Sequence, residues 1–172
     1  ASEREVITMA ENACYDLRGF IEASKQIGDW KEIKGADWNL EIGALIETAA
    51  ELITQPPMLL FDEIKNYPRG FRVAALLFAS YKRVALALGL PHEKSKLELV
   101  RLASRKIRSS QPIPPLEVKT GPVMENVLKG KDVDLLRFPA LRSHENDGGR
   151  YIGTGDTVIN RDPDSGFINM GT

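Results

Sequence analysis

Apolar residues recur at helical spacing from the sixteenth residue onward. Asp16 can cap a helix with its carboxylate, and Gly28 can end that helix in a left-handed turn. The apolar positions between them fall near one face: Leu17, Phe20, Ile21 and Ile27. This pattern predicts one amphipathic helix.

Strand and helix patterns then alternate along the chain. Residues 30–34 alternate apolar and charged side chains, as a half-buried strand does. Asn39 can cap an apolar-striped helix that reaches Ile53, and the prolines that follow end it. The continuous apolar run 58–61 and the segment 71–78 predict two buried strands.

Two further helices are predicted before the composition changes. Ser80 can cap a helix that runs through Leu88 and stops at Gly89, and Pro91 can open a longer helix to about Ser109. Because helices alternate with strands, we expect an α/β fold class.

A proline-rich stretch at residues 111–115 predicts a domain boundary, since proline favours extended linker geometry. We expect an N-terminal arm (1–14), an α/β domain (15–110), this linker and a β-rich segment (116–172). Glycine and proline divide the last segment into four expected strands: 116–120, 123–128, 151–160 and 167–172.

Composition and charge narrow the class of function. The 172 residues carry a formal net charge of −1, which offers no field to hold a nucleic acid or an anionic membrane. No apolar run is long enough to span a bilayer, the N-terminus has no apolar signal core, and the single cysteine, Cys14, has no internal partner. We therefore expect a cytoplasmic protein.

Several local motifs have ordinary explanations. His144 and Asp147 are possible metal ligands or proton carriers, but a solvated loop has the same composition. Cys14 could act as a nucleophile with His92 or His144, although no local base supports it. The Gly130-Lys131-Asp132 run lacks features of a phosphate loop, and residues 162–166 fit a hairpin turn better than a calcium loop.

Basic residues gather near the end of the last predicted helix. Helical spacing spreads them over more than one face, and they suit the negative end of the helix dipole. They are Arg101, Arg105, Lys106 and Arg108. A solvated surface explains them, and an anionic partner is an open alternative.

The final strand carries the most specific chemistry. Period-two alternation places Phe167, Asn169 and Gly171 on one face. Glycine lets a bulky ligand approach the backbone, and an asparagine carboxamide oxygen is a neutral ligand for Mn²⁺ or Mg²⁺. The alternative is that Asn169 only satisfies an edge-strand hydrogen bond.

Six motifs, in order along nearly the whole chain from residue 15, resemble the UbiD family of reversible decarboxylases. They are 16–21 (DLRGFI), 83–90 (RVALALGL), 118–128 (VKTGPVMENVL), 132–139 (DVDLLRFP), 144–155 (HENDGGRYIGTG) and 169–172 (NMGT). The resemblance implies an α/β domain followed by the opening strands of a flavin-binding split β-barrel. It also implies a lyase of aromatic acid metabolism that acts on aromatic, heteroaromatic or α,β-unsaturated carboxylic acids.

The resemblance implies a cofactor and a set of site residues. Family members use prenylated FMN, held through Mn²⁺ and K⁺, and form a covalent adduct between cofactor and substrate. Asn169 matches the manganese ligand, and Met170 matches the position whose carbonyl faces potassium. Gly171 and Thr172 match the strip along the flavin, and Thr154 is expected near the flavin or substrate.

The resemblance also implies what this chain does not carry. The family's substrate-binding arginine, its histidine and glutamate metal ligands and its proton-transferring glutamates come from later segments. We therefore expect an N-terminal fragment, inactive alone, that works with the rest of the decarboxylase chain or a second subunit. Further expected partners are a flavin prenyltransferase that supplies the cofactor and a second copy in a homodimer. A non-catalytic accessory subunit and a flavin-dependent oxidoreductase are the alternatives.

Overall fold

The computed structural model describes residues 16–111, 113, 114, 116–153 and 157–171. Its first helix, α1 (Leu17–Gln26), begins and ends where the sequence predicts. The Asp16 side chain accepts a 2.7 Å hydrogen bond from the Gly19 N–H, and Gly28 has a φ of +70° after the last turn. The expected arm, residues 1–14, lies outside the described residues.

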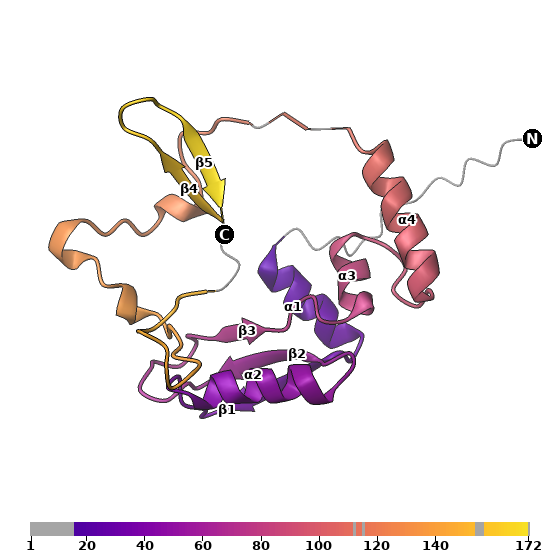
Figure 1. Cartoon of the computed structure of the whole chain (residues 1–172), viewed down its shortest axis with the longest axis horizontal. Helices are drawn as coiled ribbons and strands as arrows, with labels where there is room; N and C mark the ends of the chain where they lie inside the picture. The colour runs from indigo at the N-terminus through magenta and orange to yellow at the C-terminus, as the bar shows by residue number, and fades with distance from the viewer. Residues whose placement is uncertain (1–15, 112, 115, 154–156, 172) are drawn as a thin grey trace, which may run out of the picture.

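A small mixed sheet forms the centre of the N-terminal half. The strand β1 (Trp30–Lys34) leads into the helix α2 (Glu41–Leu52), and the next strand β2 (Met58–Asp62) pairs with β1 in parallel. A short strand β3 (Val73–Ala75) pairs with β2 in the antiparallel direction, so β2 lies in the middle of the sheet. Figure 1 shows α1 and α2 on opposite sides of this sheet.

The core follows from the alternation of side chains along β2. Leu59 and Phe61 belong to a buried cluster with Ile42 of α2. Met58 and Leu60 belong to another with Phe20 and Ile21 of α1. The sheet is therefore buried on both faces, which explains why residues 58–61 are apolar without a break.

Two helices follow the sheet, and one starts later than predicted. Ser80 caps α3 (Tyr81–Ala87), as expected. The prediction that Pro91 opens the next helix is wrong, because α4 (Lys96–Ser109) begins after Ser95. Ser95 and Glu98 form a reciprocal capping box, which satisfies two backbone donors that a start at Pro91 would leave open.

Two other boundaries differ from the sequence prediction. The strand expected at 71–78 shortens to β3, because Leu76 turns into the left-handed region with a φ of +57°. Asn39 does not cap α2. Leu40 occupies the N-cap position without a side-chain hydrogen bond, and the Asn39 N–H donates to Asp37 Oδ1.

One arginine is fully buried where α3 meets the sheet. Arg83 pairs with Asp29 at 2.5 Å, and its guanidinium donates to the carbonyls of Asp29, Pro56, Leu76 and Leu77. Burial lowers the pKa of Arg83, and Asp29 opposes that effect. The side chain thus joins three loops to α3 from inside the core.

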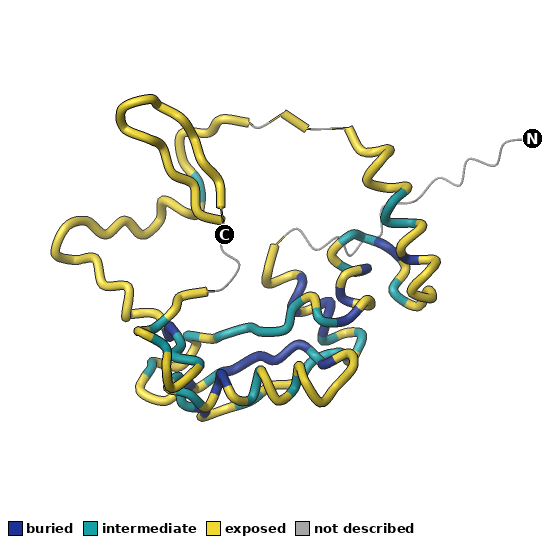
Figure 2. Tube along the Cα trace, viewed as in Figure 1, coloured by how far each residue is buried: buried dark blue, intermediate teal, exposed yellow. Residues whose placement is uncertain are grey.

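The segment after the proline-rich stretch is mostly exposed (Figure 2). The strands expected at 116–120 and 123–128 are wrong, and short 3₁₀ turns occupy Pro122–Met124, Gly130–Asp132 and Leu135–Arg137. Pro122 has no N–H to donate, and neither segment has a strand partner among the described residues. Helices and small sheets together agree with the expected α/β class, and no closed barrel is present in the described residues.

The chain returns to the N-terminal half at residues 139–151, which we name the returning segment. Leu141 and Tyr151 exchange backbone hydrogen bonds, and Arg142 pairs with the backbone of Trp38 and Leu40. Ala140 is buried in this contact. The expected strand 151–160 is therefore divided: Tyr151 forms an isolated bridge, and strand geometry begins at Val158.

Candidate functional site

Three of the residues expected to bind a cofactor, Asn169, Met170 and Gly171, lie on a hairpin at the C-terminal end of the described chain. Its strands are β4 (Val158–Arg161) and β5 (Ile168–Gly171), which pair antiparallel. Asp162 builds the turn, because its Oδ1 accepts hydrogen bonds from the N–H groups of Asp164 and Ser165. These bonds, that from Ser165 above all, lower the pKa of Asp162. The prediction of a hairpin turn at 162–166 is confirmed.

The register places two carboxamides opposite each other. Asn160 pairs with Asn169, and Val158 pairs with Gly171, so these four residues share one face of the hairpin. The opposite face carries Ile159, Arg161, Ile168 and Met170. The sequence analysis did not identify Asn160 as a neighbour of Asn169, because the residue that lies opposite Asn169 depends on the length of the turn.

The structure describes three of the five expected site residues. Asn169, Met170 and Gly171 are consecutive on β5, and all three are exposed. Thr154 and Thr172 lie outside the described residues. The roles of all five stay predictions.

The hairpin fits one part of a metal and cofactor site. An asparagine oxygen is a suitable ligand for a hard cation. An ideal Cβ on Gly171 would meet only the Asn169 Nδ2, at 3.9 Å, so a flat ring could approach the backbone there. The described part of the chain contains no group of three or more His, Cys, Asp or Glu side chains that could hold a metal. The remaining ligands would have to come from elsewhere.

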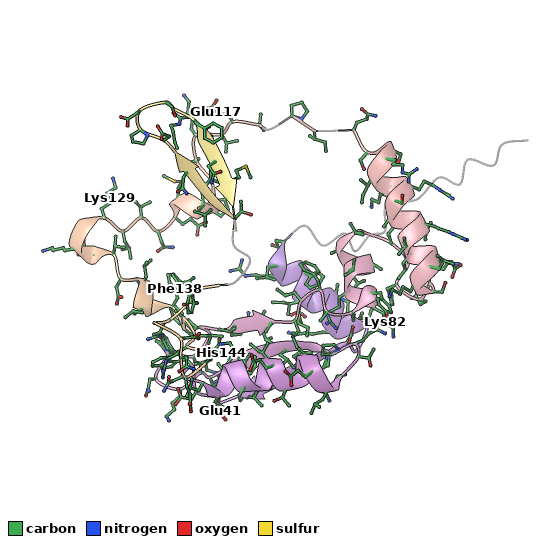
Figure 3. All side chains as sticks on the ribbon, viewed as in Figure 1. Glu41, Lys82, Glu117, Lys129, Phe138 and His144 are labelled. Atoms are coloured by element: carbon green, nitrogen blue, oxygen red, sulfur yellow. The ribbon has the colours of Figure 1, made fainter. Side chains whose placement is uncertain are left out.

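A second polar cluster joins α2 to the returning segment. His144 Nε2 lies 2.5 Å from Glu47 Oε1, and its Nδ1 lies 3.4 Å from Asp147 Oδ1. Asp147 also accepts hydrogen bonds from the backbone N–H groups of Ser143 and His144, at 2.9 Å each. Figure 3 shows His144 beside α2. Sequence spacing could not reveal Glu47 as a partner, because it lies 97 positions earlier.

The electrostatics of this cluster favour a charged imidazole. The hydrogen bond to Glu47, followed by the charge of Glu47, raises the pKa of His144. The backbone N–H of His144 is the main cause that lowers the pKa of Asp147. An imidazolium between two carboxylates has both N–H groups engaged, so the cluster acts as a clamp between two segments rather than as a free general base.

Arg150 makes a further contact between the returning segment and the N-terminal half. The Arg150 guanidinium lies 3.8 Å from the centroid of the Trp38 ring, and its Nε donates to the Ala140 carbonyl at 2.8 Å. It also donates to the Tyr67 hydroxyl, which in turn donates to the Leu136 carbonyl at 3.1 Å. Stacking and hydrogen bonding therefore fix both ends of the returning segment to the sheet domain.

A cleft of about 490 Å³ lies between α2, β3 and the returning segment. Its walls include Ile46, Glu47, the strand β3 and, from the returning segment, Leu141, His144 and Tyr151. The cleft is mainly apolar, with the Glu47 and His144 pair at its polar side. None of the expected cofactor ligands Asn169, Met170 and Gly171 lines it.

None of the helices in the described ranges is both long and apolar enough to pass through a membrane.

Comparison with protein families matches two family models. The 3-octaprenyl-4-hydroxybenzoate carboxy-lyase N-terminal domain (UbiD_N) matches residues 21–113. The 3-octaprenyl-4-hydroxybenzoate carboxy-lyase Rift-related domain (UbiD) matches residues 116–172.

Curated relatives include the pyrrole-2-carboxylic acid decarboxylase of Pseudomonas aeruginosa. It is 35% identical over an alignment of 160 positions, which covers 88% of this chain and 32% of that protein. An uncharacterised protein of Synechocystis is 30% identical over an alignment of 178 positions, which covers 91% of this chain and 34% of that protein. The chain thus spans about a third of the length of these relatives.

Solved structures of the vanillic acid decarboxylase ShVdcCD from Sedimentibacter hydroxybenzoicus resemble the chain. Its open form has a TM-score of 0.75 and 31% identity, covering 91% of this chain and 33% of that chain. Its closed form has a TM-score of 0.73 and 32% identity, covering 86% and 31%. With a family model matching more than half of its residues, the chain belongs to the UbiD family.

Proposed function

We propose that the chain is part of a decarboxylase that removes CO₂ from aromatic, heteroaromatic or α,β-unsaturated carboxylic acids, reversibly and without net oxidation, with prenylated FMN as cofactor. The observation that carries the proposal is Asn169 on β5, opposite Asn160, within the segment that matches the Rift-related model. The acids named for the Pseudomonas and Sedimentibacter relatives support this substrate class.

In this proposal the hairpin holds one side of the cofactor. Asn169 would bind Mn²⁺ through its carboxamide oxygen, and the carbonyl of Met170 would face K⁺. Gly171 would leave room for the flat ring system, while Thr154 and Thr172 would line it. Prenylated FMN, when bound, supplies the electron sink for the loss of CO₂.

The proposed activity belongs to a larger assembly than this chain. A cation held by one neutral amide is bound weakly, and the described residues contain no group of three or more His, Cys, Asp or Glu side chains that could hold it. The rest of a longer chain or a second subunit would complete the site. One solved vanillic acid decarboxylase contains a truncated second component, ShVdcD, which supports a two-component arrangement. A homodimer and a flavin prenyltransferase as cofactor supplier complete the proposed partners, in the cytoplasm.

The test uses the intact protein that contains this chain, produced together with a flavin prenyltransferase and purified without oxygen. Pyrrole-2-carboxylate, vanillate and an acrylic acid would be offered separately, and CO₂ and product measured. We expect decarboxylation of at least one acid without nicotinamide oxidation. Nicotinamide turnover without CO₂ release would instead support the oxidoreductase alternative. Activity of the purified 172-residue chain alone would contradict the proposed shared site.

Two matched asparagine variants distinguish the proposed role of Asn169 from a general effect of substitution. Asn169→Ala should reduce bound flavin and manganese, measured by absorbance and elemental analysis. Asn146→Ala, at an exposed position of the returning segment, should leave both unchanged. Equal loss in the two variants, or no loss in Asn169→Ala, would remove the role proposed for Asn169.

The face of the hairpin opposite Asn169 favours the alternative that the chain is a non-catalytic accessory subunit. Ile159 and Met170 are 65% and 66% exposed on that face. Adjacent exposed apolar side chains of this kind are typical of a surface that binds a partner. An accessory subunit would use it to dock a catalytic partner. Restored activity when the 172-residue chain joins a separately produced catalytic chain with its own cofactor site would support this alternative.

A further inference from the structure

The residue opposite the proposed metal ligand is a second asparagine. Asn160 of β4 and Asn169 of β5 are register partners, and Figure 1 shows their two strands side by side. Directly opposed residues of an antiparallel pair have Cβ atoms about 4.5–5.5 Å apart. Two carboxamides on facing Cβ atoms are therefore within hydrogen-bonding reach of each other.

Neither strand preference nor the turn explains this pair of amides. Asparagine is depleted in strands, and here two asparagines occupy facing positions. The turn takes its side-chain hydrogen bonds from Asp162 and Ser165. Both asparagines are exposed, and within the described ranges neither carboxamide forms a hydrogen bond. The two amides are thus available to a ligand and to each other.

A carboxamide that binds a cation needs a fixed orientation. Its oxygen can coordinate, whereas its nitrogen only donates hydrogen bonds, and the two ends have nearly the same shape. Half a turn of the amide group therefore replaces the ligand oxygen by an NH₂ group. Outer-shell hydrogen bonds commonly hold metal ligands in the orientation that binds. For Asn169, such a bond requires an acceptor that faces its Nδ2.

Asn160 has the side chain that can supply this acceptor. The face consists of Val158, Asn160, Asn169 and Gly171. Valine and glycine have no side-chain acceptor, whereas the Asn160 Oδ1 can accept two hydrogen bonds. The Asn169 Nδ2 lies 3.9 Å from an ideal Cβ on Gly171, so this amide lies over the shared face. A flat ring that covers the face would displace water from Nδ2 and leave it in need of a protein acceptor.

We propose that Asn160 is a positioning residue for the metal ligand. Its Oδ1 accepts a hydrogen bond from the Asn169 Nδ2, and this bond keeps the Asn169 oxygen directed at Mn²⁺. The inference rests on the proposed function, because it gives Asn160 a task at the same cofactor site. It differs from direct ligation by Asn160, in which the Asn160 oxygen would bind the cation and leave the orientation of Asn169 unfixed.

The test measures Mn²⁺ binding to the intact protein that contains this chain, produced with a flavin prenyltransferase and freed of metal by a chelator. The electron paramagnetic resonance signal of free Mn²⁺ gives the affinity during a titration. Asn160→Leu keeps the size of the side chain without an acceptor, and should weaken binding about tenfold or more. The matched control is Arg161→Leu, on the other face of β4, which should bind as the unchanged protein does.

Rescue by aspartate separates a positioning role from ligation. Asn160→Asp keeps an acceptor oxygen and should bind Mn²⁺ within about threefold of the unchanged protein, because a carboxylate still accepts from Nδ2. A direct ligand would respond differently, since an added ligand charge strengthens cation binding. A gain of about tenfold in Asn160→Asp would therefore overturn the proposal in favour of ligation.

The most specific arm changes the ligand itself. Asn169→Asp has two equivalent oxygens, so half a turn changes nothing and no positioning partner is needed. Adding Asn160→Leu to Asn169→Asp should cost less than about threefold in Mn²⁺ affinity, and adding it to Asn169→Ala should also cost little. An equal loss in all three backgrounds would show that residue 160 acts on the hairpin as a whole, and would overturn the proposal.

The outcomes keep this inference apart from the proposed function. Loss of Mn²⁺ binding in Asn169→Ala, but not in Asn160→Leu, would overturn the inference alone. Unchanged binding in both variants would overturn the inference and the proposed metal site together. Hydrogen exchange of the β4 and β5 amides should be alike in Asn160→Leu and Arg161→Leu. A loss of protection only in Asn160→Leu would assign the effect to hairpin stability and overturn the positioning role.

Discussion

Gly43 of α2 and Ser143 of the returning segment are in backbone contact. An ideal Cβ on Gly43 would lie 2.6 Å from both the Cα and the carbonyl oxygen of Ser143. Glycine costs helix stability at an interior position. Here it allows a strand-like segment to lie directly on the helix backbone, next to the Glu47 and His144 pair.

Gly43→Ala should therefore destabilise the protein, although alanine is the better helix former. Overpacking against backbone costs about 1–3 kcal/mol, and the gain in helix propensity offsets about 1 kcal/mol of it. Urea unfolding should show a net loss of roughly 1 kcal/mol. Gly148→Ala is the matched control, since a Cβ there meets nothing within 4 Å. A Gly43→Ala protein more stable than the unchanged chain would contradict this contact.

The clamp at His144 should depend on pH. Because its folded pKa is raised above the ordinary value of about 6.5, the imidazolium stabilises the folded state below that pH. The contribution is lost as pH rises through the folded pKa. Asp147, whose pKa is lowered, stays ionised over this whole range. Urea midpoints between pH 5.5 and 8.5 should fall with pH by more in the unchanged chain than in His144→Gln.

Glu47→Gln should shift the His144 titration to lower pH, because Glu47 is the largest cause of the raised pKa. Imidazole proton signals measured by NMR across the same range would report it. Glu51→Gln, one turn further along α2, is the control and should leave the His144 titration in place. An identical titration in the unchanged chain and Glu47→Gln would mean that the 2.5 Å pair does not persist in solution.

The buried arginine should be essential for the α/β domain. Arg83→Met removes the guanidinium that pairs with Asp29 and donates to four backbone carbonyls. Removal of one partner of a buried pair costs about 3–5 kcal/mol, so the urea midpoint should fall sharply or folding should fail. Lys82→Met, at the exposed neighbouring position, should change stability by less than about 0.5 kcal/mol.

Hydrogen exchange should not follow the domain boundary that the proline-rich stretch 111–115 predicts, because the returning segment packs on the N-terminal half. Amides of Leu141, Arg142 and Tyr151 donate to backbone carbonyls and should exchange slowly, together with β2. Most amides between residues 116 and 136 lie on the exposed surface and should exchange rapidly. Mass spectrometry of peptide fragments would show this order. Equal protection of both stretches would contradict the described packing.

The sequence predicted the elements whose signals are local. Asp16, Ser80 and the apolar run of β2 each act within a few residues, so the positions of α1, α3 and β2 could be read directly. The start of α4 was predicted wrongly, because the Ser95 and Glu98 capping box, and not Pro91, sets where this helix begins. The strands expected at 116–120 and 123–128 failed because an apolar segment becomes a strand only beside a partner.

The candidate site was predictable only in part, for a related reason. Alternation predicted the shared face of Asn169 and Gly171, and the resemblance named their roles. The register that adds Asn160 depends on the turn at Asp162. Neither the Glu47 and His144 pair nor the stacking of Arg150 on Trp38 has a sequence signal, because their partners lie far apart along the chain.

The returning segment also sets the order in which the protein can be completed during synthesis. Asn39 and Arg142 are bridge partners 103 positions apart. Because synthesis proceeds from the N-terminus, Asn39 leaves the ribosome well before Arg142. The sheet, α1 and α2 can therefore assemble before Arg150 has been synthesised. At that stage Trp38 and Tyr67 lack the guanidinium that contacts them in the finished protein. Until Arg150 emerges, the nascent domain presents an aromatic surface without its cover. Chaperone binding to the growing chain should end only when translation has passed Tyr151.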